Sequence, residues 1–216
     1  MKRLFLLSTL IFLSTFGVKA QSASDLFTKS ATKIYWLGID FSHVKLIGDF
    51  AQFSEAGEAG PLTIRNKYFP GWNNLILTEY AKYDVGGMFR KESINFKTNA
   101  ITKINALAST EEMEDESEPY YTKEMIQNFI KGYDFLVKEG IGMLFVAESL
   151  NKYREVGKYH FVALNLATNE ILIHEVFEGK AGGIGLRNYW ARSFYEVIIQ
   201  IRDEQFRVWK KEYGTK

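Results

Sequence analysis

Three histidines are the side chains of this chain best suited to acid–base or metal chemistry near neutral pH. His160 and His174 fall on two apolar runs, 158–166 and 171–178, that are typical of paired strands. A two-residue turn between the runs would place His160 opposite Phe177, so that the two histidines would face opposite sides of the sheet. A zinc ion needs its ligands gathered around one point. The sequence therefore predicts no metal site on these strands.

A second candidate site lies at the end of the apolar run 33–41, KIYWLGIDF. Ligands often bind beyond the ends of strands in α/β sheets. Asp40 and His43 stand at this end and could form an acid–base pair. A histidine in a solvated loop is the simpler interpretation, so the two residues are candidates for ligand binding and not for catalysis.

The segment 179–185, GKAGGIG, has the context of a phosphate-binding loop, because it follows a strand and precedes a helix. Its sequence fits neither G-x-x-x-x-G-K-[ST] nor G-x-G-x-x-G. A flexible connection to the helix is the favoured interpretation, and contact with a small anion, a sugar or a peptide is the alternative. The residues that would make such contact are Lys180, Arg187, Asn188, Tyr189 and Trp190.

The spacing Ser-x-x-Lys, which serine acyl-transfer enzymes use, occurs at Ser30–Lys33, Ser42–Lys45 and Ser149–Lys152. Three matches to so short a pattern show how easily it arises. Neither Lys-Thr-Gly nor Ser-Asp-Asn accompanies them, and no Gly-x-Ser-x-Gly is present. The sequence therefore predicts no catalytic residue and no cofactor.

The first twenty residues have the three-part layout of a secretory signal peptide. A basic start is followed by the apolar run 4–16 and by small residues at Val18 and Ala20. The run is shorter than the roughly 20 residues of a membrane-spanning helix, so a retained N-terminal anchor is the less favoured alternative. We expect cleavage after Ala20, a periplasmic or secreted product, and a single domain over 21–216.

Composition narrows the possibilities further. The chain has no cysteine, which excludes a lipid anchor on a cysteine, disulfides and thiolate metal sites. It has 27 basic and 26 acidic residues, and removal of Lys2, Arg3 and Lys19 with the signal leaves a slight acidic excess. Such a balance gives no attraction to nucleic acid. No later segment is long and apolar enough to span a membrane.

Periodicity and turn residues predict the order of the elements. The expected elements are a strand at 33–41, helices at 72–81 and after Asp84, a strand near 99–107, a helix from Thr122 to Gly140, a strand at 141–149, hairpin strands at 158–166 and 171–178, and a helix at about 188–211. The acidic segment 111–119 is expected to be an exposed connection, because closely spaced like charges repel one another and stay solvated. Calcium binding is the less favoured alternative, since the segment lacks the spaced ligands of a calcium loop.

These elements predict an α/β fold of the α+β two-layer type. We expect a mixed sheet of four or five strands that ends in a hairpin, with the long amphipathic C-terminal helix lying across it.

The second half of the chain resembles a known pattern. A capped helix leads into the strand GIGMLFVAES, the hairpin KYHFVALNLATNEILIHEVF and the helix NYWARSFYEVIIQIRDEQF. This order is similar to the small periplasmic α/β domain of the TolB N-terminal, LpoB and YajG type. The chain departs from that family by lacking the anchoring cysteine of its lipoproteins and the β-propeller that follows in TolB.

The resemblance implies a binding or assembly domain of the bacterial cell envelope. We therefore expect an exported, non-enzymatic domain that binds an envelope protein or a small ligand. Two alternatives stay open: an enzyme with a site near Asp40 and His43 or near residues 179–190, and a glycan-binding module that uses exposed aromatic rings.

Overall fold

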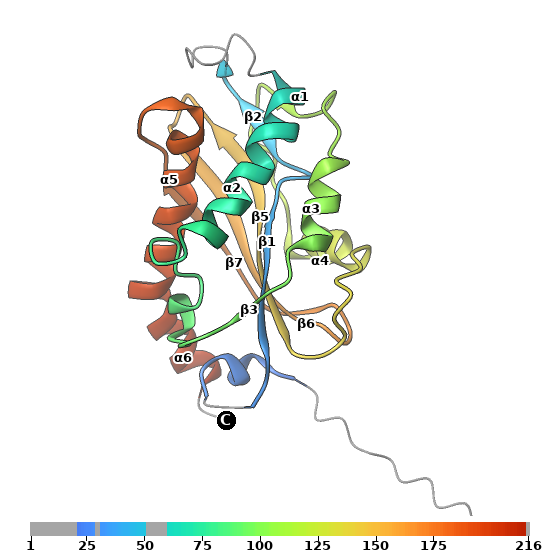
Figure 1. The fold of residues 1–216 in the computed structure, drawn as a ribbon, viewed down its shortest axis with the longest axis vertical. Coiled ribbons are helices and arrows are strands. Elements are labelled where there is room, and N and C mark those ends of the chain that lie inside the picture. Colours follow the sequence, from blue (N-terminus) through green and yellow to red (C-terminus); the bar gives the residue numbers. More distant parts are fainter. Residues whose placement is uncertain (1–20, 29–30, 51–59, 215–216) are drawn as a thin grey trace, which may run out of the picture.

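The computed structural model describes residues 21–28, 31–50 and 60–214 (Figure 1). The predicted signal peptide, its cleavage site and Ser30 lie outside these residues. Within the described ranges, no helix combines the length and the apolar character needed to cross a membrane.

One sheet contains all seven described strands. They are β1 (Ile34–Asp40), β2 (Lys45–Ile47), β3 (Asn95–Phe96), β4 (Glu114–Asp115), β5 (Ile141–Asn151), β6 (Val156–Asn165) and β7 (Glu170–Lys180).

β5 is the axis of the sheet. β1 and β2 pair in parallel with its first and second halves, end to end along one edge, and β6 pairs antiparallel with the other edge. The short strands β3 and β4 extend the sheet in parallel beyond β1 and β2, and β7 closes the other side as the hairpin partner of β6. Because β5 is paired on both edges and covered on both faces, all eleven of its residues are buried.

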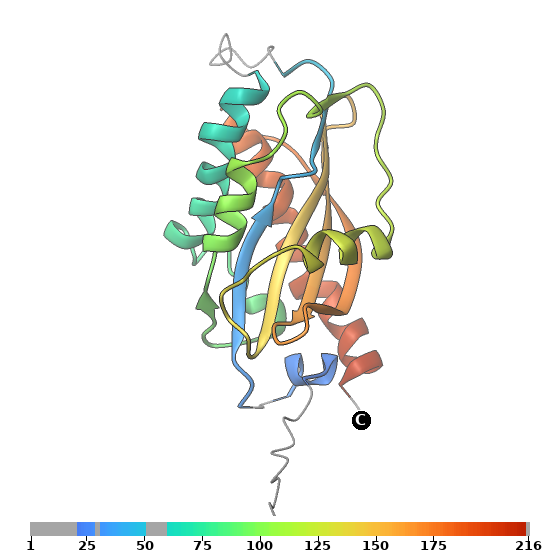
Figure 2. The same ribbon diagram turned by 90° about the vertical axis from the view of Figure 1, so that its right-hand side faces the viewer.

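Helices cover both faces of the sheet. They are α1 (Pro61–Thr63), α2 (Phe69–Thr78), α3 (Asn99–Ala106), α4 (Lys123–Lys131), α5 (Gly185–Gln200) and α6 (Phe206–Tyr213). π-helical turns at Ile64–Tyr68 and Ile201–Gln205 make α1 continuous with α2 and α5 continuous with α6. Figure 2 shows α4 on the near side of the curled sheet and α5 on the far side.

Two apolar clusters separate the helices from the sheet. On one face, α2, α5 and α6 pack with Trp72, Trp190 and Trp209 against β1, β5 and β6. On the other face, α3 and α4 contribute Ile101 and Ile126 to a smaller cluster with β1 and β5. Aromatic burial thus supplies the core of a chain without disulfides.

The fold prediction was therefore wrong in its architecture, although the α/β class is correct. A two-layer sandwich with a mixed sheet of four or five strands was expected. The structure has helix layers on both faces and seven strands, of which β3, β1, β5, β2 and β4 pair only in parallel with one another. The antiparallel pairings are confined to the run from β5 through β6 to β7. The sequence could not show that α4 and α5 cover opposite faces of the sheet.

Two of the predicted elements were also wrong. The strand expected near 99–107 is instead the helix α3, because Ala100 and Ile101 bury one side of a helical turn against β1. The helix capped by Thr122 ends at Lys131 and not near Gly140. Beyond it Leu136 takes a left-handed φ of 57°, which continues no helix.

Candidate functional site

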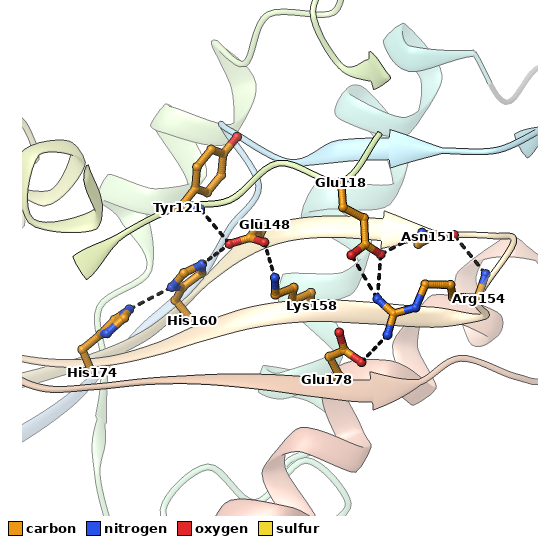
Figure 3. Close-up of polar contacts among 9 residues, drawn as sticks. All are labelled: Glu118, Tyr121, Glu148, Asn151, Arg154, Lys158, His160, His174 and Glu178. Carbon is orange, nitrogen blue, oxygen red and sulfur yellow. Dashed lines mark hydrogen bonds and ion pairs between the residues drawn. The ribbon is translucent and has the colours of Figure 1, made fainter. Parts of the chain in front are cut away.

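A row of ionisable side chains crosses the sheet on the face covered by α4 (Figure 3). Glu148 on β5 lies at its centre, with Oε2 2.6 Å from Nε2 of His160 and Oε1 2.7 Å from the ammonium of Lys158. Beyond His160, Nδ1 lies 2.8 Å from Nε2 of His174 on β7. We call Lys158, Glu148, His160 and His174 the polar row. It connects three neighbouring strands through side chains alone.

A β-bulge aims Glu148 into this row. Ala147 is opposite Tyr159 and Ser149 is opposite Lys158, so Glu148 is the extra residue on β5. Bulges bend a strand locally and redirect a side chain. One sequence signal could have drawn attention to this position: Glu148 directly follows the apolar run Met143–Ala147.

The register of the hairpin brings the two histidines together, and the prediction that they lie apart was wrong. Asn165 pairs with Glu170 across a four-residue turn, and Leu172 forms a bulge on β7. Both features differ from the two-residue turn that was expected. Together they shift the pairing by one residue, and a one-residue shift reverses the face of every side chain. His160 and His174 consequently share a face.

The charge on Glu148 is stabilised although the side chain is only 1% exposed. Burial by itself raises the pKa of Glu148, but hydrogen bonds from His160, from Lys158 and from the backbone N–H of Tyr121 outweigh it and hold the pKa below its usual value. An ionised carboxylate only accepts hydrogen bonds, so His160 donates to it from Nε2. The hydrogen bond between His160 and His174 places one further proton between the two imidazole rings.

His174 is the partly exposed end of the row. Burial, together with the neighbouring His160 and Lys123, lowers its pKa to about 4. His174 is therefore neutral at neutral pH. A neutral His174 can donate a hydrogen bond from Nε2 to Nδ1 of His160 without adding a positive charge to the row.

The segment before α4 covers the row. The backbone N–H of Tyr121 donates to Glu148 at 3.1 Å, and its hydroxyl donates to the carbonyl of His43 at 2.7 Å. His160 is wholly buried beneath this cover. A substrate therefore has no access to the acid–base groups in the middle of the row.

A second polar contact fastens the acidic segment to the sheet (Figure 3). Arg154, in the turn between β5 and β6, donates to both carboxylate oxygens of Glu118 at 2.9 and 3.0 Å and to Glu178 at 2.7 Å. Asn151 also donates to Glu118 at 2.7 Å. Glu118 is thus held in place, whereas 111–112 and 114–117 are exposed.

The polar row does not have the geometry of a metal centre. Its two imidazole nitrogens bond directly to each other. Across the part of the chain that the structure describes, no group of three or more histidine, aspartate or glutamate side chains could hold a metal ion. The row is a buried hydrogen-bond network that links strands.

Asp40 and His43 do not meet as an acid–base pair among the described contacts. Asp40 is wholly buried and accepts hydrogen bonds from the hydroxyl of Tyr133 and, at 2.8 Å, from the N–H of Ser42. Burial and the nearby Asp40 raise the pKa of Tyr133. The imidazole of His43 stacks on Phe129 with 3.7 Å between ring centroids, and burial lowers its pKa.

The five candidates near the glycine-rich loop are divided between surface and core. Trp190 is wholly buried and stacks on Phe50, so it has no face for a sugar. Tyr189 is also buried, and its hydroxyl donates to Glu155. The three that are exposed are Lys180, Arg187 and Asn188.

The two Ser-x-x-Lys pairs within the described residues do not form. The ammonium of Lys152 lies 3.0 Å from the hydroxyl of Tyr189, whereas the hydroxyl of Ser149 is buried without a hydrogen-bond partner in the described part of the chain. The ammonium of Lys45 donates to the carbonyl of Glu112. No serine is thereby activated by a lysine in either pair.

A groove of about 590 Å³ lies between α2 and α3, at the edge of the sheet next to β1. Its polar groups are amides, hydroxyls and one guanidinium, and most of its lining surface is apolar. The lining residues are Arg65, Asn66, Pro70, Asn73, Asn74, Leu77, Thr98, Thr102, Asn105 and Ala106. This volume and mixture are typical of small-molecule sites.

Two asparagines form the floor of the groove. Asn73 accepts from the N–H of Ile39 at 2.7 Å and donates to its carbonyl at 2.9 Å. Asn105 accepts from the N–H of Phe41 at 2.7 Å and donates to the carbonyl of Ile39 at 2.8 Å. The amides take the place of a neighbouring strand, because β3 pairs with β1 only at Tyr35 and Trp36.

The groove therefore lies beside the carboxyl end of β1, where the sequence predicted a site, although neither Asp40 nor His43 lines it. The buried asparagines in two helices were a sequence signal for this site that our sequence analysis missed. A buried side-chain amide in a helix needs a hydrogen-bond partner, which is either a backbone group or a ligand.

A second cavity, of about 390 Å³, opens beside the glycine-rich loop. Asn188 is the one predicted residue that lines it. Its other lining residues are Lys82, Tyr83, Gly182, Gly183, Arg192, Tyr195 and Glu196.

Comparison with known proteins adds no identification to this geometry. No protein-family model matches the chain, and no curated protein is significantly similar to it.

Proposed function

We propose that this chain is an exported, non-enzymatic binding domain of the bacterial cell envelope and that the groove between α2 and α3 holds its ligand. The observation that carries the proposal is the groove itself, which has about 590 Å³ of space and a mostly apolar lining that carries several amide and hydroxyl groups. The burial of Glu148 and His160 supports a role in binding over one in catalysis.

The lining defines the class of ligand. Asn73 and Asn105 are occupied by the backbone of β1, and the hydroxyl of Thr102 donates to the carbonyl of Thr98 at 3.0 Å. The side-chain amide of Asn74 makes no hydrogen bond to the described residues, so it is available to a ligand. The groove contains no carboxylate, and its one guanidinium, that of Arg65, already donates to Asn66 and to the carbonyl of Ala108. We infer a small neutral ligand with hydroxyl or amide groups.

Apolar contacts in the groove limit the shape of that ligand. Pro70 and Leu77 lie one turn before and one turn after Asn74 on α2, and Ala106 faces them from α3. Leu77 is 39% exposed, so a ligand would remove apolar surface from water as well as form hydrogen bonds.

Asn74→Leu tests the proposal. The mature chain is titrated by calorimetry with a panel of neutral saccharides and blocked short peptides, and at least one compound is expected to bind. Asn74→Leu should weaken that binding by tenfold or more, since it removes the amide and fills the groove. Asn128→Leu makes the same change on the exposed side of α4 and should leave binding unchanged.

The proposal fails if no neutral compound binds, or if Asn74→Leu and Asn128→Leu bind equally well. Thermal unfolding of both variants shows whether a loss of binding reflects a loss of folding. Export is tested separately, because it rests on residues 1–20 and not on the groove.

A further inference from the structure

The cavity beside the glycine-rich loop has a different chemistry from the groove. It has about 390 Å³ of space. The loop after α2, the loop after β7 and the first three turns of α5 form its walls. Two cations, Lys82 and Arg192, line it together with the single carboxylate of Glu196. Its lining is thus net positive, whereas the chain as a whole is near neutral.

Lys82 has no anionic partner within the described residues. No described carboxylate lies within ion-pair distance of its ammonium, which sits instead over two aromatic rings, 5.0 Å from the centroid of Tyr83 and 5.6 Å from that of Tyr195. The rings hold the charge at the cavity wall by cation–π attraction. The side of the ammonium that faces away from the rings is left for a ligand.

Glu196 orients the guanidinium of Arg192 but engages only its Nε. This Nε lies 3.1 Å from Oε1 of Glu196, one turn along α5. The terminal nitrogens make no hydrogen bond to the described residues. A guanidinium can bind two oxygens of one carboxylate or phosphate in parallel, and fixing one nitrogen aims the others.

The loop keeps the cavity open beside Arg192. Gly183 has a φ of 121°, which favours glycine, and a side chain at Gly182 would contact Arg192 Cδ at 3.4 Å. Asn188 also lines the cavity, and its amide nitrogen donates to the carbonyl of Ile184 at 3.2 Å. The result is a small cavity with two cations and an uncharged hydrogen-bonding group.

We propose that this cavity binds an oxyanion, a carboxylate or phosphate group on a small ligand, between Lys82 and Arg192. The site is separate from the groove between α2 and α3, and it requires no bond-forming step. It is the minority alternative that the glycine-rich sequence suggested, with Lys82 and Arg192 as the binding cations in place of Lys180 and Arg187.

Nuclear magnetic resonance of the full mature chain tests the site. The ¹⁵N-labelled protein is titrated with inorganic phosphate and, in a second arm, with acetate at constant ionic strength. We expect saturable shifts of the Gly182, Gly183 and Asn188 amides in at least one arm. The arm that saturates identifies the oxyanion.

Charge removal provides the control. Lys82→Gln and Arg192→Gln should each weaken the saturable binding by about tenfold or more. Lys67 also sits over a tyrosine ring, with its ammonium 5.4 Å from the centroid of Tyr68, so Lys67→Gln is a matched change that should have no effect.

Three results would overturn the site: shifts that rise linearly without saturation, shifts spread over the whole surface, or equal binding by Lys82→Gln and Lys67→Gln. The dispersion of the amide spectrum shows in each variant whether the fold is retained. Binding in this cavity is read from amides far along the chain from Asn74, so its failure and the failure of the groove are distinguished.

Discussion

Nδ1 of His160 lies 2.8 Å from Nε2 of His174, although the two residues are not directly opposite each other on β6 and β7. The contact is diagonal across the hairpin, and it extends a buried ion pair from β5 to the outermost strand. It makes the hairpin sensitive both to the charge at Glu148 and to the protonation of His174.

Glu148→Gln should reduce the free energy of unfolding by about 3 kcal/mol, because it leaves Lys158 and His160 facing an uncharged amide in a buried site. Urea unfolding measures the change. Glu175→Gln removes an exposed carboxylate from β7 and should alter stability by less than about 0.5 kcal/mol. Equal effects of the two substitutions would show that the buried charge stabilises nothing.

Stability should fall as the pH is lowered from about 6.5 to about 4. The folded-state pKa of His174, about 4, lies below the unfolded value of 6.5, so in this window the unfolded chain binds more protons. Protonation therefore favours unfolding, and full stability returns above pH 6.5. Urea midpoints across the window measure the slope.

His174→Gln should flatten this pH dependence while keeping a hydrogen-bond donor next to His160. The lowered pKa of His43 acts in the same direction, so part of the slope should persist in the variant. A slope identical to that of the wild type would rule out His174 as its source.

Asn105→Ala should cost about 2 kcal/mol, because it leaves the buried N–H of Phe41 without an acceptor. Hydrogen exchange gives a local reading, since the Phe41 amide should lose protection while the centre of β5 keeps it. Asn128→Ala, an amide deletion on the exposed side of α4, is the comparison and should leave both measurements unchanged. Retained protection at Phe41 would contradict the substitute-strand role of the asparagine.

Processing should yield a mature chain that begins at Gln21, as read by the intact mass of protein recovered after expression with residues 1–20 in place. Ala20→Arg should block cleavage, because a signal peptidase accepts a small residue at this position. A full-length mass for the unaltered chain would refute the predicted cleavage.

The sequence was sufficient for the elements whose pattern is local. The strand at 33–41, the cap at Thr122, the hairpin and the C-terminal helix are all present, because apolar periodicity and capping residues act within a few positions. The helix α3 was missed, since its many Asn and Thr residues obscured the helical spacing of Ile101 and Ile104.

What the sequence could not provide was register and layer. The bulges at Glu148 and Leu172 have no marker in the residue pattern, and each changes which side chains share a face. The same limit applied to the groove, because Asn73 and Asn105 meet only through the edge of β1.

The pairing of β1 with β5 has a consequence for how the chain must fold. Ile34 pairs with Ile141, so the first strand is made long before its partner. A contact of such high sequence separation forms slowly, and it cannot form before β5 has been made. Until residues 141–151 follow, the described strands of the N-terminal half have only the two-residue pairings of β1 with β3 and of β2 with β4. Such a delay would keep the chain unfolded during the export that we propose.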